Sequence, residues 1–361
     1  MGVLDEFTVR SSVEEFSSLC VRLSSVMSRV WEERFREEFL RSRSGALERA
    51  KRPIDVFSSR AFILPDRIRV EFPAGTSVIV STVSNPALRV KNRKVTIYLR
   101  VSTLGSWFGR TFISIVEFDF DELKGVVDVE ARMLIPALMP FECVEDPRVD
   151  VDSEDVLYHV RGFYTKWLNA TLTFVAKFTH DGILLRPVAF SDGSEEFILR
   201  DFRDTFPLNS RMMTLRPYFR DLETGGIFVG PREGEVVDAG EVKPIPELMP
   251  GKGELKTGGN CVIPISKREY LLIYHTVDEF EVYRCYAAIL NSEGEVLAYT
   301  PRPILVPDPH IYSGRRPGTV FPCGIGVIGN TVVVVAGFSD EIVVVYEGSL
   351  DNLLAEMREI K

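Results

Sequence analysis

The sequence has few residues of the kinds that metal sites and disulfide frameworks require. Its five cysteines are widely spaced with no Cys-x-x-Cys pair, and its four histidines include no His-Glu-x-x-His pattern. Zinc ribbons and disulfide scaffolds need closer, paired ligands. The sequence therefore argues against both classes, and reduced thiols and no bound metal are expected.

Long apolar runs and excess positive charge are also missing. The longest apolar runs, such as residues 331–337, fall far short of the roughly 20 residues that span a bilayer. With 43 Lys and Arg against 52 Asp and Glu, the net charge of −9 argues against binding to nucleic acid or an anionic membrane. Residues 1–10 carry no apolar segment, so no signal peptide is expected and the simplest location is the cytoplasm.

The first part of the chain has a helical period. From about Ser12 to Ala50, apolar residues recur at three- and four-residue steps, Ser12 and Glu15 form a capping-box pattern, and a break is expected near Ser42–Gly45. The apolar positions are Val13, Phe16, Leu19, Cys20, Leu23, Val26, Met27 and Val30. This stripe must be buried, either on the same chain or in a subunit contact, so a homo-oligomer through these helices stays open.

After about Pro65 the pattern changes to short β-runs rich in Val, Ile, Tyr and Phe, separated by turn residues. Examples are Ser77–Val83, Val95–Val101, Thr111–Phe118, Thr171–Phe178, Tyr270–His275, Tyr283–Leu290 and Thr331–Ala336. No long helical pattern returns before Leu350–Ile360. Many short strands predict a sandwich, a barrel or a propeller. The span is too long for one sandwich, and a fifth of it suits one propeller blade, although internal repeats are faint.

Three stretches place polar groups among the β-runs. The first is Glu145–Arg148, which is typical of a turn but can also position a general acid at Asp146. The second is Lys256–Asn260 with His275, where a solvated lysine and a core histidine are the plain alternatives to a site. The third is Phe321–Gly324, followed by Asp340. Its Cys323 is more typical of a small core residue than of a nucleophile.

The order of these segments along the chain resembles glycoside hydrolase family 130, mostly β-mannoside phosphorylases on a five-bladed β-propeller. The resemblance runs from roughly Ser84 to the C-terminus. The matching segments are Asn85-Pro86-Ala87, Tyr98-Leu99-Arg100-Val101, Glu145-Asp146-Pro147-Arg148, Phe206-Pro207, Arg216-Pro217, Lys256-Thr257-Gly258-Gly259, Leu271–Thr276, Tyr283–Ala288, Phe321-Pro322-Cys323-Gly324 and Asp340. It implies an all-β, five-bladed β-propeller with a short C-terminal helix. Residues 1–64 are then a helical extension and residues 65–361 the catalytic domain.

The resemblance also implies a reaction. Phosphate attacks a β-mannoside with inversion and gives α-mannose 1-phosphate, while Asp146 acts as general acid through the 3-hydroxyl of the sugar. An inverting hydrolase needs a second carboxylate to activate water, whereas phosphate is itself a nucleophile and needs cations to hold it. No cofactor is implied beyond inorganic phosphate as co-substrate. The implied partners are phosphate and a β-linked mannoside, with no nucleic acid and no membrane.

Site residues follow from the matched motifs. The implied phosphate-binding residues are Arg200, Arg203, Arg216, Lys256, His275 and Tyr283. The implied substrate-binding residues are Asn85, Arg100, Arg148 and Asp340. The arginine that the family places before Phe-Pro falls nearest Asp201, so the choice between Arg200 and Arg203 stays open. The family's histidine before Arg216 is replaced by Leu215, and residues 260–263 replace a Gly-Pro-Pro-Pro run.

Two alternatives remain at this point. A β-mannoside hydrolase on the same scaffold is favoured by Leu215 and by the undecided arginine, because hydrolytic members of the family tend to lose phosphate-binding cations. A non-catalytic, glycan-binding propeller is the other, since a fold does not fix a function. Cations that converge on Asp146 would distinguish an enzyme from a scaffold.

Overall fold

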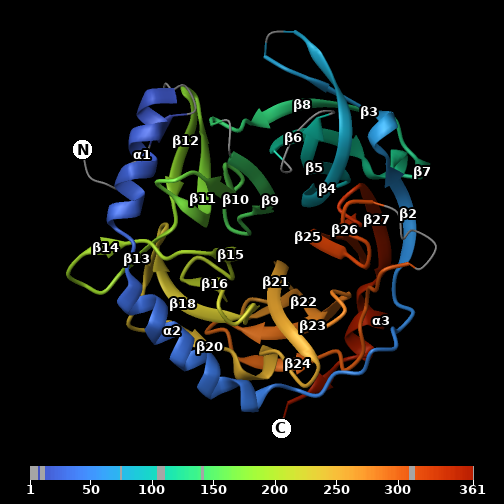
Figure 1. Cartoon of the computed structure of the whole chain (residues 1–361). Helices are drawn as coiled ribbons and strands as arrows, with labels where there is room; N and C mark the ends of the chain where they lie inside the picture. The colour runs from blue at the N-terminus through green and yellow to red at the C-terminus, as the bar shows by residue number, and fades with distance from the viewer. Residues whose placement is uncertain are drawn as a thin grey trace.

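A computed structural model describes residues 7–8, 13–73, 75–103, 110–139, 142–308 and 314–360. Five groups of strands stand around a common centre, so the chain is an all-β, five-bladed propeller, as expected (Figure 1). The innermost strands are β4, β9, β15, β21 and β25, and each contacts the innermost strands of the neighbouring blades. The ends of these five strands therefore define both mouths of the central channel.

Each blade is an antiparallel unit extended by additional strands. Blade 1 closes into a small barrel of β3 (Ile68–Glu71), β4 (Ser77–Lys91), β5 (Lys94–Thr103), β6 (Thr111–Asp119) and β8 (Val129–Ile135). Blade 2 contains β9 (Glu142–Val149), β10 (Val156–Tyr164), β11 (Asn169–Thr179), β12 (Gly182–Pro187) and, at its edge, β1 (Phe7–Thr8). Blade 3 contains β13 (Ala189–Ser191), β14 (Glu196–Phe197), β15 (Phe202–Pro207), β16 (Met212–Phe219), β18 (Phe228–Glu233), β19 (Val236–Asp238) and β20 (Lys243–Pro244).

Blade 4 contains β21 (Glu254–Pro264), β22 (Glu269–Asp278), β23 (Tyr283–Asn291), β24 (Val296–Tyr299) and β28 (Arg358–Glu359), and β17 (Thr224–Gly225) links it to blade 3. Blade 5 contains β25 (Val320–Ile328), β26 (Thr331–Phe338), β27 (Ile342–Ser349), β2 (Ser58–Ile63) and β7 (Gly125–Val126). Because β2 pairs with β27, chain from before residue 65 completes the last blade. Two strands of residues 1–64, β1 and β2, thus pair with strands of the propeller.

Strand β26 shows why the blades stack. Its run of valines is buried on both faces, and alternate side chains enter different apolar clusters. Val333 and Val335 pack in the cluster shared with blade 1, whereas Val332 and Val334 pack in the cluster shared with blade 4. Side chains alternate across a strand with period two, so one valine-rich strand serves two interfaces. All seven β-runs named from the sequence are strands, which confirms that part of the prediction.

The N-terminal helices lie on the outside of the ring. Helices α1 (Val13–Ser25) and α2 (Arg29–Ser42) lie along blades 2 and 3 (Figure 1). Leu19 and Leu23 are buried against blades 1 and 2, and Phe35 and Phe39 are buried against blades 2 and 3. Leu19, Cys20 and Leu23 of the apolar stripe are thus covered by the same chain, whereas Val30 is 79% exposed, so the stripe is covered only in part.

Two details of the helices differ from expectation. A break at residues 26–28, which the sequence pattern did not indicate, separates α1 from α2, while the expected turn near Ser42–Gly45 is present as a 3₁₀ helix at Arg43–Gly45. The C-terminal helix α3 (Leu350–Ala355) is shorter than predicted, because the chain then forms β28. The proposed cap at Ser12 lies outside the described residues.

Two expectations from composition can be compared with the structure. All five cysteines are free and buried, which confirms the absence of a disulfide framework. Within the described ranges, no helix is long and apolar enough to cross a membrane.

Removal of one α2 anchor tests this packing. Phe39 is fully buried, and Leu40, the next residue, is 47% exposed. We expect Phe39→Ala to lower the free energy of unfolding by about 3–5 kcal/mol, because it leaves a cavity under the helix. The matched variant Leu40→Ala should change it by less than about 1 kcal/mol. Chemical denaturation measures both, and equal effects would contradict the docking of α2.

Candidate active site

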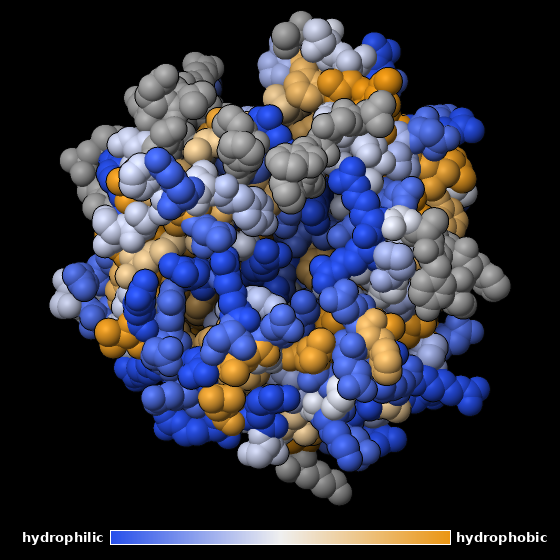
Figure 2. All heavy atoms as spheres, in the orientation of Figure 1, coloured by the Kyte–Doolittle hydropathy of each residue, from blue (hydrophilic) through white to orange (hydrophobic). Residues whose placement is uncertain are grey.

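A polar cavity of about 200 Å³ lies at one mouth of the central channel. Figure 2 shows a hollow lined by hydrophilic residues at the centre of the propeller face. The residues that line the cavity are Asn85, Arg100, Glu145, Asp146, Tyr164, Arg203, Asp204, Arg216, Lys256, His275, Tyr283, Arg316, Thr319, Phe321 and Asp340. All five blades contribute, so the site exists only when the ring is closed.

Irregular pairing in the inner strands turns polar side chains toward this cavity. Each of β4, β9, β15, β21 and β25 has a register shift against its neighbour near the cavity. The residues that the pairing passes over are 85–86, 146–147, 204–205, 260 and 323. Asn85, Asp146 and Asp204 have φ of 43°, 50° and 46°. Asn and Asp tolerate this left-handed conformation better than most residues, which explains their use at these bulges.

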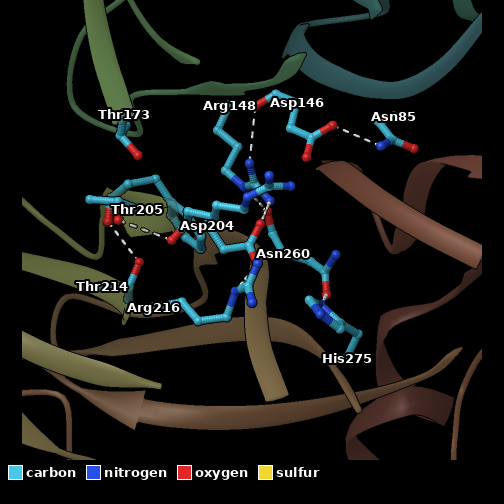
Figure 3. A network of polar contacts seen from close by, with 12 residues as sticks. Asn85, Asp146, Arg148, Thr173, Asp204, Thr205, Thr214, Arg216, Asn260 and His275 are labelled. Carbon is cyan, nitrogen blue, oxygen red and sulfur yellow. Dashed lines mark hydrogen bonds and ion pairs between the residues drawn. The ribbon is translucent and has the colours of Figure 1, made fainter. Parts of the chain in front are cut away.

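Asp146 and Glu145 are neighbours whose environments differ. Asn85 Nδ2 donates a hydrogen bond of 2.7 Å to Asp146 Oδ1 (Figure 3), whereas Arg100 Nη2 donates one of 2.8 Å to Glu145 Oε1. Burial and the charge of Glu145 raise the pKa of Asp146 despite the attraction of Arg100. Burial acts in the same direction on Glu145, but Arg100 and Arg203 overcome it and lower the pKa of Glu145. Asp146 is therefore the carboxyl suited to hold a proton.

Asp204 lies deeper and is ionised. Arg148 Nη2 donates to Asp204 Oδ1 at 2.6 Å, and Arg216 Nε lies 2.5 Å from Asp204 Oδ2 (Figure 3). Burial alone would raise its pKa, but Arg216 and Arg148 outweigh burial and lower the pKa of Asp204 to about 2. At neutral pH this carboxylate neutralises part of the charge of two arginines.

His275 is neutral, which corrects its expected role as a cation. It is 1% exposed, and burial, with the nearby charge of Arg216, lowers the pKa of His275 to about 3. Its Nδ1 lies 2.9 Å from Asn260 Oδ1, and its ring stacks on Tyr283 with centroids 5.4 Å apart. His275 can therefore exchange hydrogen bonds with a ligand but supplies no charge.

Lys256 carries only part of a charge at neutral pH. Burial, together with the charges of cavity arginines, lowers the pKa of Lys256 to about 7. The contributing arginines are Arg216, Arg316 and Arg203. Gly258 follows on the same strand, and a Cβ there would lie 2.6 Å from Asp204 Oδ2 and 2.6 Å from His275 Cε1. Glycine is thus needed where β21 passes the site.

Most of the residues singled out from the sequence meet in this cavity. They are Asn85, Arg100, Asp146, Arg203, Arg216, Lys256, His275, Tyr283 and Asp340. Arg200 does not belong to it, because Arg200 is exposed and borders a separate groove beside α2, where its backbone N–H donates to Glu32 Oε1. Arg203 therefore remains as the arginine before Phe206.

Arg148 also differs from its expected role of binding substrate. It is 2% exposed and lies behind the cavity, where its guanidinium contacts the protein on three sides. Its Nε donates to Asn260 O, its Nη1 to Asp146 O and its Nη2 to Asp204 Oδ1 (Figure 3). Arg148 thus positions the bulges of three blades instead of contacting a ligand.

Four lining residues were not singled out from the sequence: Tyr164, Asp204, Arg316 and Thr319. Glu145 and Phe321 stood in the named motifs but were given no role of their own. Asp204 had a usable signal, because an Asp inside a β-run marks a turn or a bulge, as it does at Asp146. Arg316 had none, since it stands among turn residues with no periodicity. Among the described residues, no group of three or more His, Cys, Asp or Glu could hold a metal ion.

Comparison with known proteins shows the family of the chain. The sequence model of glycoside hydrolase family 130, which is described as β-1,4-mannooligosaccharide phosphorylase, matches residues 48–359 of the chain. The chain belongs to glycoside hydrolase family 130. The resemblance seen in the sequence is thereby confirmed.

Individual relatives of the family-130 chain are distant. A 1,2-β-oligomannan phosphorylase of Thermoanaerobacter sp. strain X514 is 33% identical over 123 residues, 33% of this chain and 39% of that protein. The β-1,2-mannobiose phosphorylase of Listeria innocua has a TM-score of 0.59 at 17% identity, covering 77% of this chain and 92% of its own. A third structure, from work on family-130 hydrolases that target β-1,2-mannosidic linkages, has a TM-score of 0.53 at 13% identity, covering 82% and 96%.

A pH titration of stability tests the neutral state of His275. The unfolded chain takes up a proton near pH 6.5, but the folded chain does so only near pH 3. Stability present above pH 6.5 is therefore lost as pH falls through this window, by up to about 1.4 kcal/mol per pH unit. We expect His275→Gln to remove that slope from denaturation curves between pH 6.5 and 4. The exposed matched control, His180→Gln, should keep it; an unchanged slope in His275→Gln would show that His275 is not buried neutral.

Proposed function

We propose that the protein catalyses inverting phosphorolysis of β-mannosides and releases α-mannose 1-phosphate. The observation that carries the proposal is that the pKa values of the cavity carboxyls are shifted in opposite directions. Asp146 has a raised pKa, whereas Glu145 and Asp204 have lowered pKa values because arginines hold them. A general acid must carry a proton at the working pH, and a general base must be able to accept one. The cavity therefore offers one acid and no well-suited base among these three carboxyls.

The proposed reaction follows from this arrangement. A phosphate oxygen attacks the anomeric carbon from the face opposite the leaving sugar, and the glycosidic C–O bond breaks as the new C–O bond forms. Asp146 gives its proton to the departing oxygen through the 3-hydroxyl of the mannosyl group, and inversion gives the α-phosphate. The proton that hydrogen phosphate loses on forming the ester returns to Asp146 through solvent, so charge and protons balance.

The remaining residues would divide between the two substrates. Arg203, Arg216 and Lys256 supply positive charge for phosphate, while Tyr283, whose pKa burial raises to about 12, keeps its hydroxyl proton as a donor. Asn85 and Asp340 lie in the same cavity and offer neutral and charged hydrogen-bond partners to sugar hydroxyls. Such convergent polar groups give a sugar site its specificity.

Hydrolysis is the second candidate, and a specific observation favours it. The cavity holds Glu145, Asp204 and Asp340 in addition to Asp146, although a phosphorylase needs only one carboxyl. The pKa of about 2 makes Asp204 a poor base for water, which argues for phosphate as the nucleophile. Phosphate dependence of the reaction separates the two candidates.

Replacement of the acid is the direct test of Asp146. We expect Asp146→Asn to lower the rate of mannoside cleavage by about 10²- to 10⁴-fold, because the leaving oxygen loses its proton donor. Thermal unfolding should show that the fold is kept. The exposed matched control, Asp181→Asn, should retain full activity. An Asp146→Asn enzyme with normal turnover would exclude the proposed mechanism.

The reaction itself is tested first in the synthetic direction. The full chain is mixed with α-mannose 1-phosphate and a panel of acceptor sugars, and free phosphate and new disaccharide are measured. We expect phosphate release that requires an acceptor, and cleavage of β-1,2- or β-1,4-mannobiose that requires phosphate. The best acceptor and the preferred mannobiose would identify the aglycone and the linkage. Cleavage at the same rate without phosphate would instead select the hydrolase.

A further inference from the structure

The positive charges of the cavity fall into two groups. The guanidinium of Arg100 is neutralised by Glu145, with Nη2 and Oε1 2.8 Å apart, and that of Arg216 by Asp204, with Nε and Oδ2 2.5 Å apart. These two ion pairs have side chains that are nearly or mostly buried. Each carboxylate therefore offsets part of the charge that its arginine offers to a ligand.

The second group consists of three cations, Arg203, Lys256 and Arg316, that form no ion pair within 4.0 Å among the described residues, although the more distant charge of Glu145 acts on Arg203. Arg203 Nη2 donates a hydrogen bond of 3.0 Å to Thr171 Oγ1. Lys256 Nζ lies 5.5 Å from the centre of the Tyr218 ring, and Arg316 Cζ lies 5.1 Å from the centre of the Tyr283 ring. All three cations line the same cavity. An aromatic ring attracts a cation without cancelling its charge, so this group is available to an anion.

The backbone holds Arg316 in place without a ligand. Its N–H donates to Ser339 O at 3.1 Å, and two residues later Gly318 O accepts from the N–H of Tyr283 at 2.9 Å. Ser339 and Asp340 form a turn with φ of 53° and 52°. That turn thus anchors Arg316 and also carries Asp340. A cation fixed in advance loses little entropy when it binds an anion.

We propose that Arg316 is a further anion-binding residue, which holds the phosphate group from the segment leading into blade 5 while Arg203 and Lys256 hold it from blades 3 and 4. The inference rests on the proposed function and extends it to a residue outside the sequence motifs. The planar guanidinium suits this role because it can donate two parallel N–H bonds to phosphate oxygens. Its stacking over Tyr283 leaves those in-plane donors free of the ring.

Proton uptake supplies an independent signature of this arrangement. Burial and the charges of Arg216, Arg316 and Arg203 keep the pKa of Lys256 near 7. A bound dianion favours the charged lysine, so binding above pH 7 should draw a proton from solvent. Loss of the charge of Arg316 should raise the pKa of Lys256 in the free enzyme and reduce that uptake. Proton uptake therefore tests the effect of Arg316 on Lys256, while the phosphate affinity tests the contact of Arg316 with the anion.

The experiment titrates the full chain with inorganic phosphate by calorimetry at pH 8 in buffers of different ionisation enthalpy. Phosphate is then mainly the dianion, so proton uptake reports the protein. We expect Arg316→Gln to weaken phosphate binding about tenfold to hundredfold and to lower proton uptake per phosphate bound. Arg316→Lys should recover part of the affinity. The adjacent Arg315, which is exposed and donates to Ser81 Oγ, gives the matched control Arg315→Gln, which should bind like the wild type.

Steady-state kinetics show whether the substitution of Arg316 affects phosphate or mannoside. In Arg316→Gln the KM for phosphate should rise by the same factor as the Kd, with a smaller change in the KM for mannoside, and the melting temperature should stay unchanged. Unchanged phosphate affinity in Arg316→Gln, with a phosphate-dependent wild type, would overturn the role of Arg316 and leave the proposed function intact. A wild type that neither binds nor requires phosphate would overturn both.

Discussion

The bulge in each inner strand is the feature on which the site depends. A regular strand would direct alternate side chains into the clusters between blades, where Leu88 and Val262 pack. The register shift in each strand instead frees Asn85, Asp146, Asp204 and Asn260 from the apolar alternation and turns them toward the channel or toward one another. The cost is left-handed backbone at three of these residues, which Asn and Asp tolerate. The apolar clusters between the blades then hold the ring closed around the bulges.

Arg148 converts these separate bulges into one structure. Its guanidinium joins the backbone oxygens of Asp146 and Asn260 to the carboxylate of Asp204, so it spans blades 2, 3 and 4. A buried arginine is tolerated only when its donors find partners, and these three acceptors engage each of its three nitrogens. The same contact lowers the pKa of Asp204, so a residue that positions the backbone also sets the protonation of the cavity. Structure and chemistry are thus coupled at one side chain.

The sequence predicted the strands well because valine-rich runs bounded by turn residues depend on local pattern, as β26 illustrates. Asp146 and Lys256 were found through motifs that keep their local order. Charge states were harder to predict from the sequence. His275 was expected among the cations, but burial against Tyr283 and Phe321 keeps its side chain neutral. Asp204 and Arg316 enter the cavity only through the closure of the ring, which no local pattern encodes. The choice of Arg203 over Arg200 likewise depends on where β15 begins, because Arg203 lies in that strand and Arg200 precedes it.

The balance of charge in the cavity explains how such a site can be stable without its ligand. Five cations converge there, and without compensation their repulsion in a buried space would be severe. Glu145 and Asp204 neutralise two of them, and the pKa of Lys256 near 7 lets a third shed its proton. What remains is an excess of positive charge on Arg203 and Arg316, which Asp340 offsets in part and which a bound phosphate would neutralise further. The additional carboxylates then reduce the repulsion among the cavity cations. Their presence does not by itself require a hydrolytic mechanism.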